Sequence, residues 1–207
     1  MKKTLMVVIC VIFGVLYFSI PPSVAVQSRP DYHIPDTPEA KEVIKAVERA
    51  YDVQAEAKFN FDIKKFPDIF INDPRFPVSS ATLKTIRELT NNPSVESAGY
   101  LDYKVAYYSW LIESTLHAEK VKEKAKQENR PLTAEEKKSL VDQNGRIAPV
   151  RSESPKRTLS LTFLSVSVDE DVATVVLNDG PWTLEMYLVL VDKKWYVAGT
   201  KGLVFHP

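Results

Sequence analysis

The amino-acid sequence predicts an α+β fold in which N-terminal helices pack on a curved C-terminal antiparallel sheet. Between residues 36 and about 142, hydrophobic side chains recur at the three- and four-residue spacing of helices. From Thr158 onward the period becomes two, which is typical of strands, and turn residues divide this part into four segments. Helices followed by a block of antiparallel strands form the separate layers of an α+β domain.

The N-terminus has the layout of an export signal. Two lysines precede an uncharged apolar run at 4–20, and small residues at Ser23 and Ala25 suit a signal peptidase. We expect residues 1–25 to be a signal peptide cleaved after Ala25. An uncleaved membrane anchor is the alternative, because the run is just long enough to span a bilayer; a lipidated Cys10 is a third reading. Each one exports the remainder, behind a polar, proline-containing spacer at 26–35.

Composition excludes several classes of function. Cys10 is the only cysteine and lies in the apolar run, so the exported part has no disulfide and no cysteine-ligated metal. The chain has 27 basic and 27 acidic side chains, and removing residues 1–25 removes two lysines, which leaves 25 against 27. We therefore expect no nucleic acid as a partner, and a membrane contact only through residues 4–20.

Three helices are predicted before the charged excursion, and an irregular stretch separates the first two. An amphipathic helix at 36–57 begins at Asp36 or Thr37 and continues into Pro38. The aromatic, proline-rich stretch 59–77 predicts a short helix or turn and a brief strand at 69–71. A second helix is capped by Ser79 or Ser80 and ends before Pro93.

The third helix is long, begins at about residue 95, and carries large apolar groups on two sides. At about 100° per residue, one face is aliphatic and comprises Leu101, Val105, Tyr108, Ile112 and Leu116. The nearly opposite face is aromatic and comprises Tyr100, Tyr103, Tyr107 and Trp110, followed by Ser114 and His117. We expect the aliphatic face to pack on the sheet. The aromatic face is predicted to be core, to line a ligand cavity, or to form an oligomer interface.

A charged helical excursion follows at about 118–157. Residues 119–130 are charged nearly all round and predict a helix that projects into water. A capping box from Thr133 to Glu136 starts a short helix, which we expect Asn144-Gly145 to end.

Four strands are predicted at 158–168, 171–177, 182–191 and 194–205, joined by tight turns into a meander. In the third strand, Trp182 and Met186 point to one face and Tyr187 to the other, because side chains alternate along a strand.

This order of elements resembles the nuclear transport factor 2-like superfamily of cone-shaped α+β proteins, in particular uncharacterised exported bacterial members. The resemblance covers roughly residues 36–207 and is carried by Tyr51 in the first helix, "FPDIFINDPR" (66–75), "YLDYKVAYYSWL" (100–111) and "EMYLVLVDKKWYVAGTKGLVFHP" (185–207). It implies a curved sheet, with one additional short strand, that wraps the long helix and leaves an open cone as a pocket. The excursion is longer than the usual connection of that family.

No catalytic constellation is evident. Enzymes of the superfamily that this chain resembles use an Asp/His or Asp/Arg pair in the cone. Here His33 lies in the spacer and His206 lies next to the C-terminus. His117 follows Glu113 by one helical turn, a pair that could relay a proton or bind a metal, but a surface pair without a third ligand is the simpler interpretation. We expect no catalytic residue, no metal and no cofactor.

The sequence thus predicts an exported, non-catalytic binding or interaction domain of the bacterial cell envelope. It would hold a small apolar ligand or a protein partner, a second copy of the chain included. The predicted contact residues are Tyr103, Tyr107, Trp110, Trp182, Met186 and Tyr187.

Two other functions remain open. The first is a cofactor-free isomerase, dehydratase or hydrolase acting on a small hydrophobic molecule in the cone. It requires a carboxylate beside a tyrosine, arginine or histidine, and the candidates are Asp73, Asp102, Glu113 and Glu185. The second is an accessory domain of a larger envelope assembly.

Overall fold

The structure, a computed structural model, describes residues 32–157 and 160–205. The predicted signal peptide or anchor, and the spacer up to residue 31, lie outside these ranges. Within them, no helix combines the length and the apolar character that crossing a bilayer requires. The chain from His33 onward forms one compact unit.

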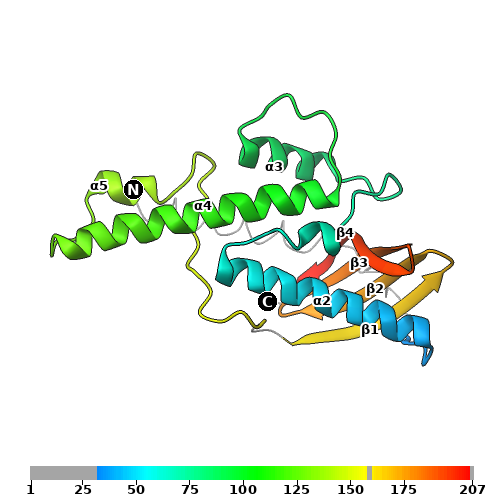
Figure 1. The fold of residues 1–207 in the computed structure, drawn as a ribbon. Coiled ribbons are helices and arrows are strands. Elements are labelled where there is room, and N and C mark those ends of the chain that lie inside the picture. The colour runs from blue at the N-terminus through cyan, green and yellow to red at the C-terminus, as the bar shows by residue number, and fades with distance from the viewer. Residues whose placement is uncertain (1–31, 158–159, 206–207) are drawn as a thin grey trace, which may run out of the picture. The chain divides into compact units, whose positions relative to one another are not determined.

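The described residues form an α+β fold, as the sequence predicted (Figure 1). The helices are α2 (Pro38–Asn60), α3 (Ser80–Thr90), α4 (Tyr100–Gln127) and α5 (Ala134–Ser139), and a 3-10 turn, η1 (Phe66–Asp68), lies between α2 and α3. The strands are β1 (Leu161–Asp169), β2 (Val172–Asp179), β3 (Trp182–Val191) and β4 (Lys194–Phe205).

The sheet is an antiparallel meander in the order β1-β2-β3-β4. It is open, so the predicted cone is not confirmed. The brief strand predicted at 69–71 is a single parallel bridge between Phe70 and Val197 on the free edge of β4. Two backbone bonds hold it: the Ile71 amide donates to the Val197 carbonyl at 3.1 Å, and the Val197 amide donates to the Ile69 carbonyl at 2.9 Å.

Helix α2 packs against β1 and β4 and covers one face of the sheet (Figure 1). It begins at Pro38, because the Thr37 hydroxyl accepts a hydrogen bond from the Ala40 amide at 3.2 Å and proline tolerates the first helical turn. Val43 and Val47 recur at four-residue spacing and are fully buried. This face supplies much of the apolar core.

An aromatic cluster joins η1 to α4. The Phe66 ring meets Tyr108 edge-on, with centroids 4.8 Å apart, and Phe70 at 5.3 Å. Phe70 in turn meets Tyr100 at 5.9 Å. Edge-to-face pairs at these distances add stability beyond the apolar area they bury, so the cluster anchors the first turns of α4 to the sheet side of the fold.

Helix α4 begins at Tyr100, later than the predicted position near 95. The Gly99 amide donates to the Asp102 carboxylate at 2.9 Å, and the Asp102 amide donates to Oδ1 of Asn72 at 3.2 Å. A Cβ at position 99 would collide with the Asn72 side chain. The close approach of Asn72 therefore requires glycine at the start of this helix.

The buried face of α4 differs from both faces that the sequence predicted. It runs between them, because at about 100° per residue the buried positions centre between the aliphatic and the aromatic groups. These positions are Tyr100, Tyr108, Leu111, Thr115, Ala118 and Ala125, while Ala106 is buried on another side of the helix, beside α3. Tyr103, Tyr107, Leu101 and Val105 flank this face and are partly buried against the core. Leu116, predicted to be core, is 46% exposed. The helix thus has one broad buried face with two flanks, and a smaller contact with α3 at Ala106.

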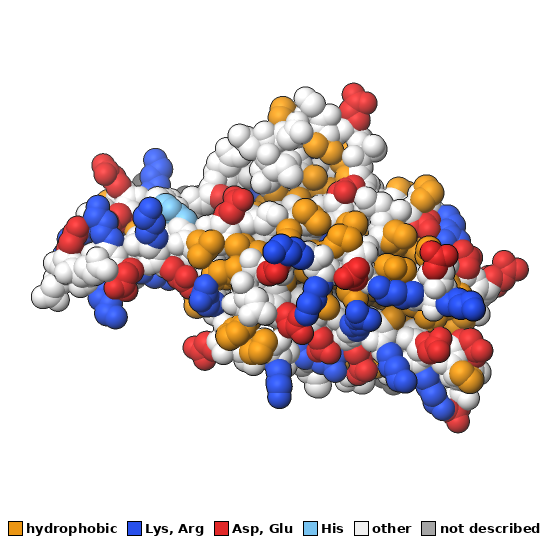
Figure 2. Space-filling model, in the orientation of Figure 1, with side chains coloured by type: hydrophobic (Ala, Val, Ile, Leu, Met, Phe, Trp, Pro, Cys, Tyr) orange, Lys and Arg blue, Asp and Glu red, His pale blue; other side chains and the backbone are white. Residues whose placement is uncertain are grey.

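The excursion keeps its own compact structure. The Thr133 capping box forms as predicted, but α5 ends at Ser139, before Asn144-Gly145. That pair instead turns a small hairpin, in which Val141 bridges Ile147. Charged side chains surround the distal end of α4 and α5, whereas hydrophobic ones gather over the middle of the same view (Figure 2).

Candidate functional site

The predicted contact residues do not converge on one place. Tyr103 and Tyr187 line the same groove, whereas Trp110 faces a separate hollow of 440 Å³ between α3 and α4. Tyr107 is partly buried and packs against the core. The other two lie apart from these. Met186 is 2% exposed in the core. Trp182 is about half exposed and lies against the Phe205 ring at a tilt of 49°, with centroids 4.5 Å apart.

The groove shared by Tyr103 and Tyr187 has a volume of 600 Å³. We call it the aromatic groove. Its walls are the segment before α3, the first turn of α4, and the adjacent parts of β3 and β4. The lining residues are Arg75, Phe76, Pro77, Val78, Ser79, Thr82, Tyr100, Tyr103, Tyr187, Gly199, Thr200 and Lys201.

A stacked ring pair forms one side of the aromatic groove. Phe76 and Tyr187 lie nearly parallel, at 12°, with centroids 4.9 Å apart. Gly199 lies beneath them, and a Cβ there would come within 3.2 Å of Tyr187 Cδ2 and 3.5 Å of Phe76 Cβ. The absence of a side chain on β4 at this position makes room for the pair.

The polar groups of the aromatic groove are mostly engaged with one another. The Tyr100 hydroxyl donates to Thr200 Oγ1 at 3.2 Å, and the Tyr187 hydroxyl donates to Glu185. Burial, together with the Glu185 carboxylate, raises the pKa of Tyr187 to about 12. Burial likewise raises the pKa of Tyr103 above its ordinary value. Both phenols are therefore neutral at physiological pH and present mainly apolar surface.

The cation at the rim is already paired. The Arg75 guanidinium donates to both carboxylate oxygens of Asp171, at 3.0 and 2.9 Å, and to those of Asp73, at 3.0 and 2.9 Å. These hydrogen bonds from Arg75 lower the pKa of Asp73. The paired rim leaves the apolar walls as the main binding feature of the groove.

The carboxylates considered for an enzyme lie in four different settings. Asp73 is held by Arg75, Glu185 accepts from Tyr187, Asp102 caps α4, and Glu113 is exposed. The His117 ring bonds Ser139 Oγ at 3.2 Å and is exposed. Within the ranges that the structure describes, no cluster of histidine, cysteine or acidic residues could hold a metal ion.

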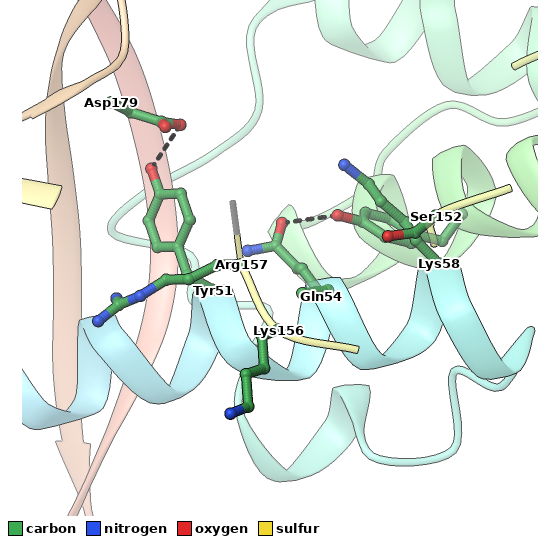
Figure 3. Close-up of a pocket in the computed structure, with 9 residues that line it drawn as sticks. Tyr51, Gln54, Lys58, Ser152, Lys156, Arg157 and Asp179 are labelled. Carbon is green, nitrogen blue, oxygen red and sulfur yellow. Dashed lines mark hydrogen bonds between the residues drawn. The ribbon is translucent and has the colours of Figure 1, made fainter. Parts of the chain in front are cut away.

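A second hollow, of 320 Å³, lies between α2, α4, the segment 152–157 and the end of β2 (Figure 3). The Tyr51 hydroxyl donates to Asp179 Oδ2 at 3.0 Å on one side. On the other side, Gln54 Oε1 accepts from the Tyr108 hydroxyl at 3.2 Å and from Lys104 Nζ at 2.6 Å. Because Lys58 also lines it, we call this hollow the lysine pocket.

Sequence reasoning missed the polar residues of the lysine pocket. Asp179 was assigned to a turn, but β2 extends to Asp179 and the turn is made by Gly180 and Pro181. Lys104 was not singled out, although a lone lysine among four tyrosines in "YLDYKVAYY" (100–108) is a signal that could have been read.

Comparisons with known proteins give no relative from which a role could be transferred. No protein-family model matches the chain, and no curated protein and no solved structure matches it.

Proposed function

We propose that this chain is an exported, non-catalytic domain of the cell envelope that binds a small, largely apolar molecule in the aromatic groove. The observation that carries the proposal is the groove itself, in which the stacked pair of Phe76 and Tyr187 faces the tyrosines at the start of α4. Export is supported by the apolar run at 4–20. The superfamily resemblance also supports a ligand between sheet and helices.

The dimensions and chemistry of the groove suit such a ligand. Small-molecule sites are typically concavities of about 300–1,000 Å³ with apolar and aromatic walls and a few polar groups that orient the ligand. Here the orienting groups are Lys201 and the hydroxyls of Thr200 and Thr82, which bond Tyr100 and Ser79 and keep further hydrogen-bonding capacity. Arg75 is engaged by two carboxylates. An uncharged ligand with one hydrogen-bonding group would meet these walls without leaving a charge unpaired.

The test uses N-phenyl-1-naphthylamine, an uncharged probe whose fluorescence rises in an apolar site. A Val78→Trp variant fills the groove from an irregular segment and leaves the core intact. A Val95→Trp variant is the matched control, because it faces the separate hollow between α3 and α4. We expect the wild type and Val95→Trp to bind the probe, and Val78→Trp to bind it at least about tenfold more weakly.

The result can contradict the proposal in two ways. Equal binding by Val78→Trp and Val95→Trp would place the probe elsewhere on the molecule. Absence of any fluorescence increase with all three proteins, while circular dichroism shows them folded, would show that the groove does not accept an apolar molecule.

A further inference from the structure

The lysine pocket holds an excess of positive charge that the described part of the protein does not neutralise. Lys58 lines the pocket, and Lys104 reaches its inner wall through Gln54. Among the described residues, neither ammonium group lies within ion-pair distance of a carboxylate. The one carboxylate lining the pocket, Asp179, accepts a hydrogen bond from the Tyr51 hydroxyl. Lys156 and Arg157 also line the pocket, and Arg157 is paired with Glu48 at 3.3 Å and with Asp52 at 3.7 Å. Positive side chains thus outnumber Asp179, the one carboxylate of the lining.

The same pocket has more hydrogen-bond donors than acceptors. Lys104 uses one donor on Gln54, and its ammonium lies over the rings of Tyr100 and Phe70, at 5.2 and 5.5 Å from the centroids. Lys58 lies over the Tyr108 ring at 5.8 Å. At the rim, Arg157 Nη1 is buried without a hydrogen-bond acceptor in the described structure. Buried donors are costly when unsatisfied, so an occupant that brings acceptors is favoured.

Burial disfavours the charged forms of Lys58 and Lys104, and for Lys58 the charge of Lys104 adds repulsion. Burial lowers the pKa of Lys104 to about 8, and the Asp179 carboxylate offsets only part of this effect. Burial and the charge of Lys104 lower the pKa of Lys58 as well. Groups that are perturbed in this way inside a hollow are characteristic of binding and catalytic sites.

We propose that the lysine pocket is a second binding site, and that it takes a small monocarboxylate. The excess of positive side chains favours an anion, and Asp179 in the lining disfavours a second negative charge on it. The carboxylate accepts a hydrogen bond from Lys58, which lines the pocket, and one from Lys104, where it replaces Gln54 Oε1. The short apolar stem of the ligand lies along Ala55 and the ring of Tyr108. At 320 Å³, the pocket admits a molecule of only a few carbon atoms.

Calorimetry on the full chain with hexanoate, and with hexanamide as its uncharged counterpart, tests the charge requirement at neutral pH. Lys58→Met and Lys104→Met remove one charge each and keep the stem of the side chain. Lys45→Met is the matched control, because Lys45 is exposed on the same helix as Lys58. We expect each pocket variant to bind hexanoate at least about tenfold more weakly, since each removes a charged hydrogen bond to the ligand. Lys45→Met should bind as the wild type does.

Proton uptake gives a second readout. The groups that face Lys104 are Lys58 on α2, Asp179 on β2, and Tyr100 and Tyr108 on α4 itself. Both phenols have raised pKa values and stay neutral below about pH 10. A bound carboxylate would raise the pKa of Lys104. Near pH 8.5, binding should therefore take up a fraction of a proton in buffers of different ionisation enthalpy, and affinity should fall as the pH rises further.

Three results would overturn the assignment: hexanamide binding as well as hexanoate, inorganic phosphate binding more tightly than hexanoate, or Lys45→Met losing as much affinity as Lys58→Met. If Lys104→Met does not fold, Lys58→Met and the proton uptake still decide. The groove variant Val78→Trp should bind hexanoate normally, so that failure of either site is seen separately.

Discussion

The two halves of α4 belong to one uninterrupted helix and have opposite environments. From Tyr100 to Thr115, the helix is packed between α2, η1 and α3, and its buried face includes two tyrosines. From Leu116 to Gln127, most side chains are exposed and many are charged. The near half contributes walls to the aromatic groove and the lysine pocket, while the distal half extends toward α5 (Figure 1).

One continuous helix thus contributes both to the packed core and to a solvent-exposed extension. Because the helix is continuous, the orientation of its near half also sets the orientation of its distal half. We therefore expect the global stability and the ligand contacts to depend on the near half. The local structure of the excursion should depend on helix capping and ion pairs. Substitutions of the same type on both sides test this division.

The largest contrast is expected between two leucines only five residues apart. Leu111 is 6% exposed and Leu116 is 46% exposed. Leu111→Ala should lower the free energy of unfolding by about 2–5 kcal/mol, because a buried truncation loses packing and leaves a cavity. Leu116→Ala should change it by less than about 0.5 kcal/mol. Urea denaturation measures both, and equal losses would remove the distinction between the halves.

The next contrast is between a partly buried and an exposed lysine of α4. The pKa of Lys104 is lowered from 10.5 to about 8. Between these pH values the unfolded chain holds the proton and the folded chain does not, so the unfolding free energy should increase with pH by up to about 3 kcal/mol. Above about pH 10 the slope reverses, because the raised pKa values of Tyr100 and Tyr108 mean that the unfolded state loses those protons first.

Denaturation curves from pH 7 to pH 10 check this effect. The rise should flatten in Lys104→Met and persist in the control Lys122→Met, which changes an exposed lysine of the distal half. Parallel profiles for the wild type and Lys104→Met would show that the ammonium group is not desolvated. Lys58, whose pKa is also lowered, contributes in the same direction.

Much of the fold was predictable from local patterns. Thr37, Ser79 and Thr133 each cap the helix that the sequence assigned to them, because capping needs only neighbours in the chain. The strands agree within a few residues, since alternation is also local. The cone shape remains a prediction, because the curvature of a sheet depends on the packing of distant elements. The superfamily resemblance also remains a prediction.

The candidate sites were less predictable, because they depend on long-range proximity. The aromatic groove joins Phe76 to Tyr187, and the lysine pocket joins Tyr51 to Asp179. The buried face of α4 was misplaced because apolar type was taken as a guide to burial. Lys104 and Thr115 lie on that face, where Thr115 satisfies its hydroxyl on the Leu111 carbonyl at 2.7 Å.

A smaller effect is expected where the excursion meets the packed region. Arg146, in the hairpin, donates to Glu88 on α3 at 2.5 Å and lies over the Trp110 ring at 6.0 Å. Arg146→Ala should lower stability by about 1 kcal/mol, since the pair is partly exposed. The more informative readout is faster hydrogen exchange in residues 140–148. Unchanged exchange there would show that this contact does not hold the hairpin in place.

The smallest global effect is expected from the capping threonine of α5, and an identical substitution on α2 provides the comparison. Thr133 Oγ1 accepts from the Glu136 amide at 3.1 Å, while the Glu136 carboxylate accepts from the Thr133 amide at 2.9 Å. Thr37 Oγ1 likewise accepts from the Ala40 amide at 3.2 Å, but α2 carries much of the core. Thr37→Ala should therefore cost about 1 kcal/mol of global stability, and Thr133→Ala less than about 0.5 kcal/mol. Hydrogen exchange in α5 should nevertheless accelerate, because the helix is short and depends on its cap. If Thr133→Ala lowered global stability as much as Thr37→Ala, the excursion would be unfolding together with the packed half of α4.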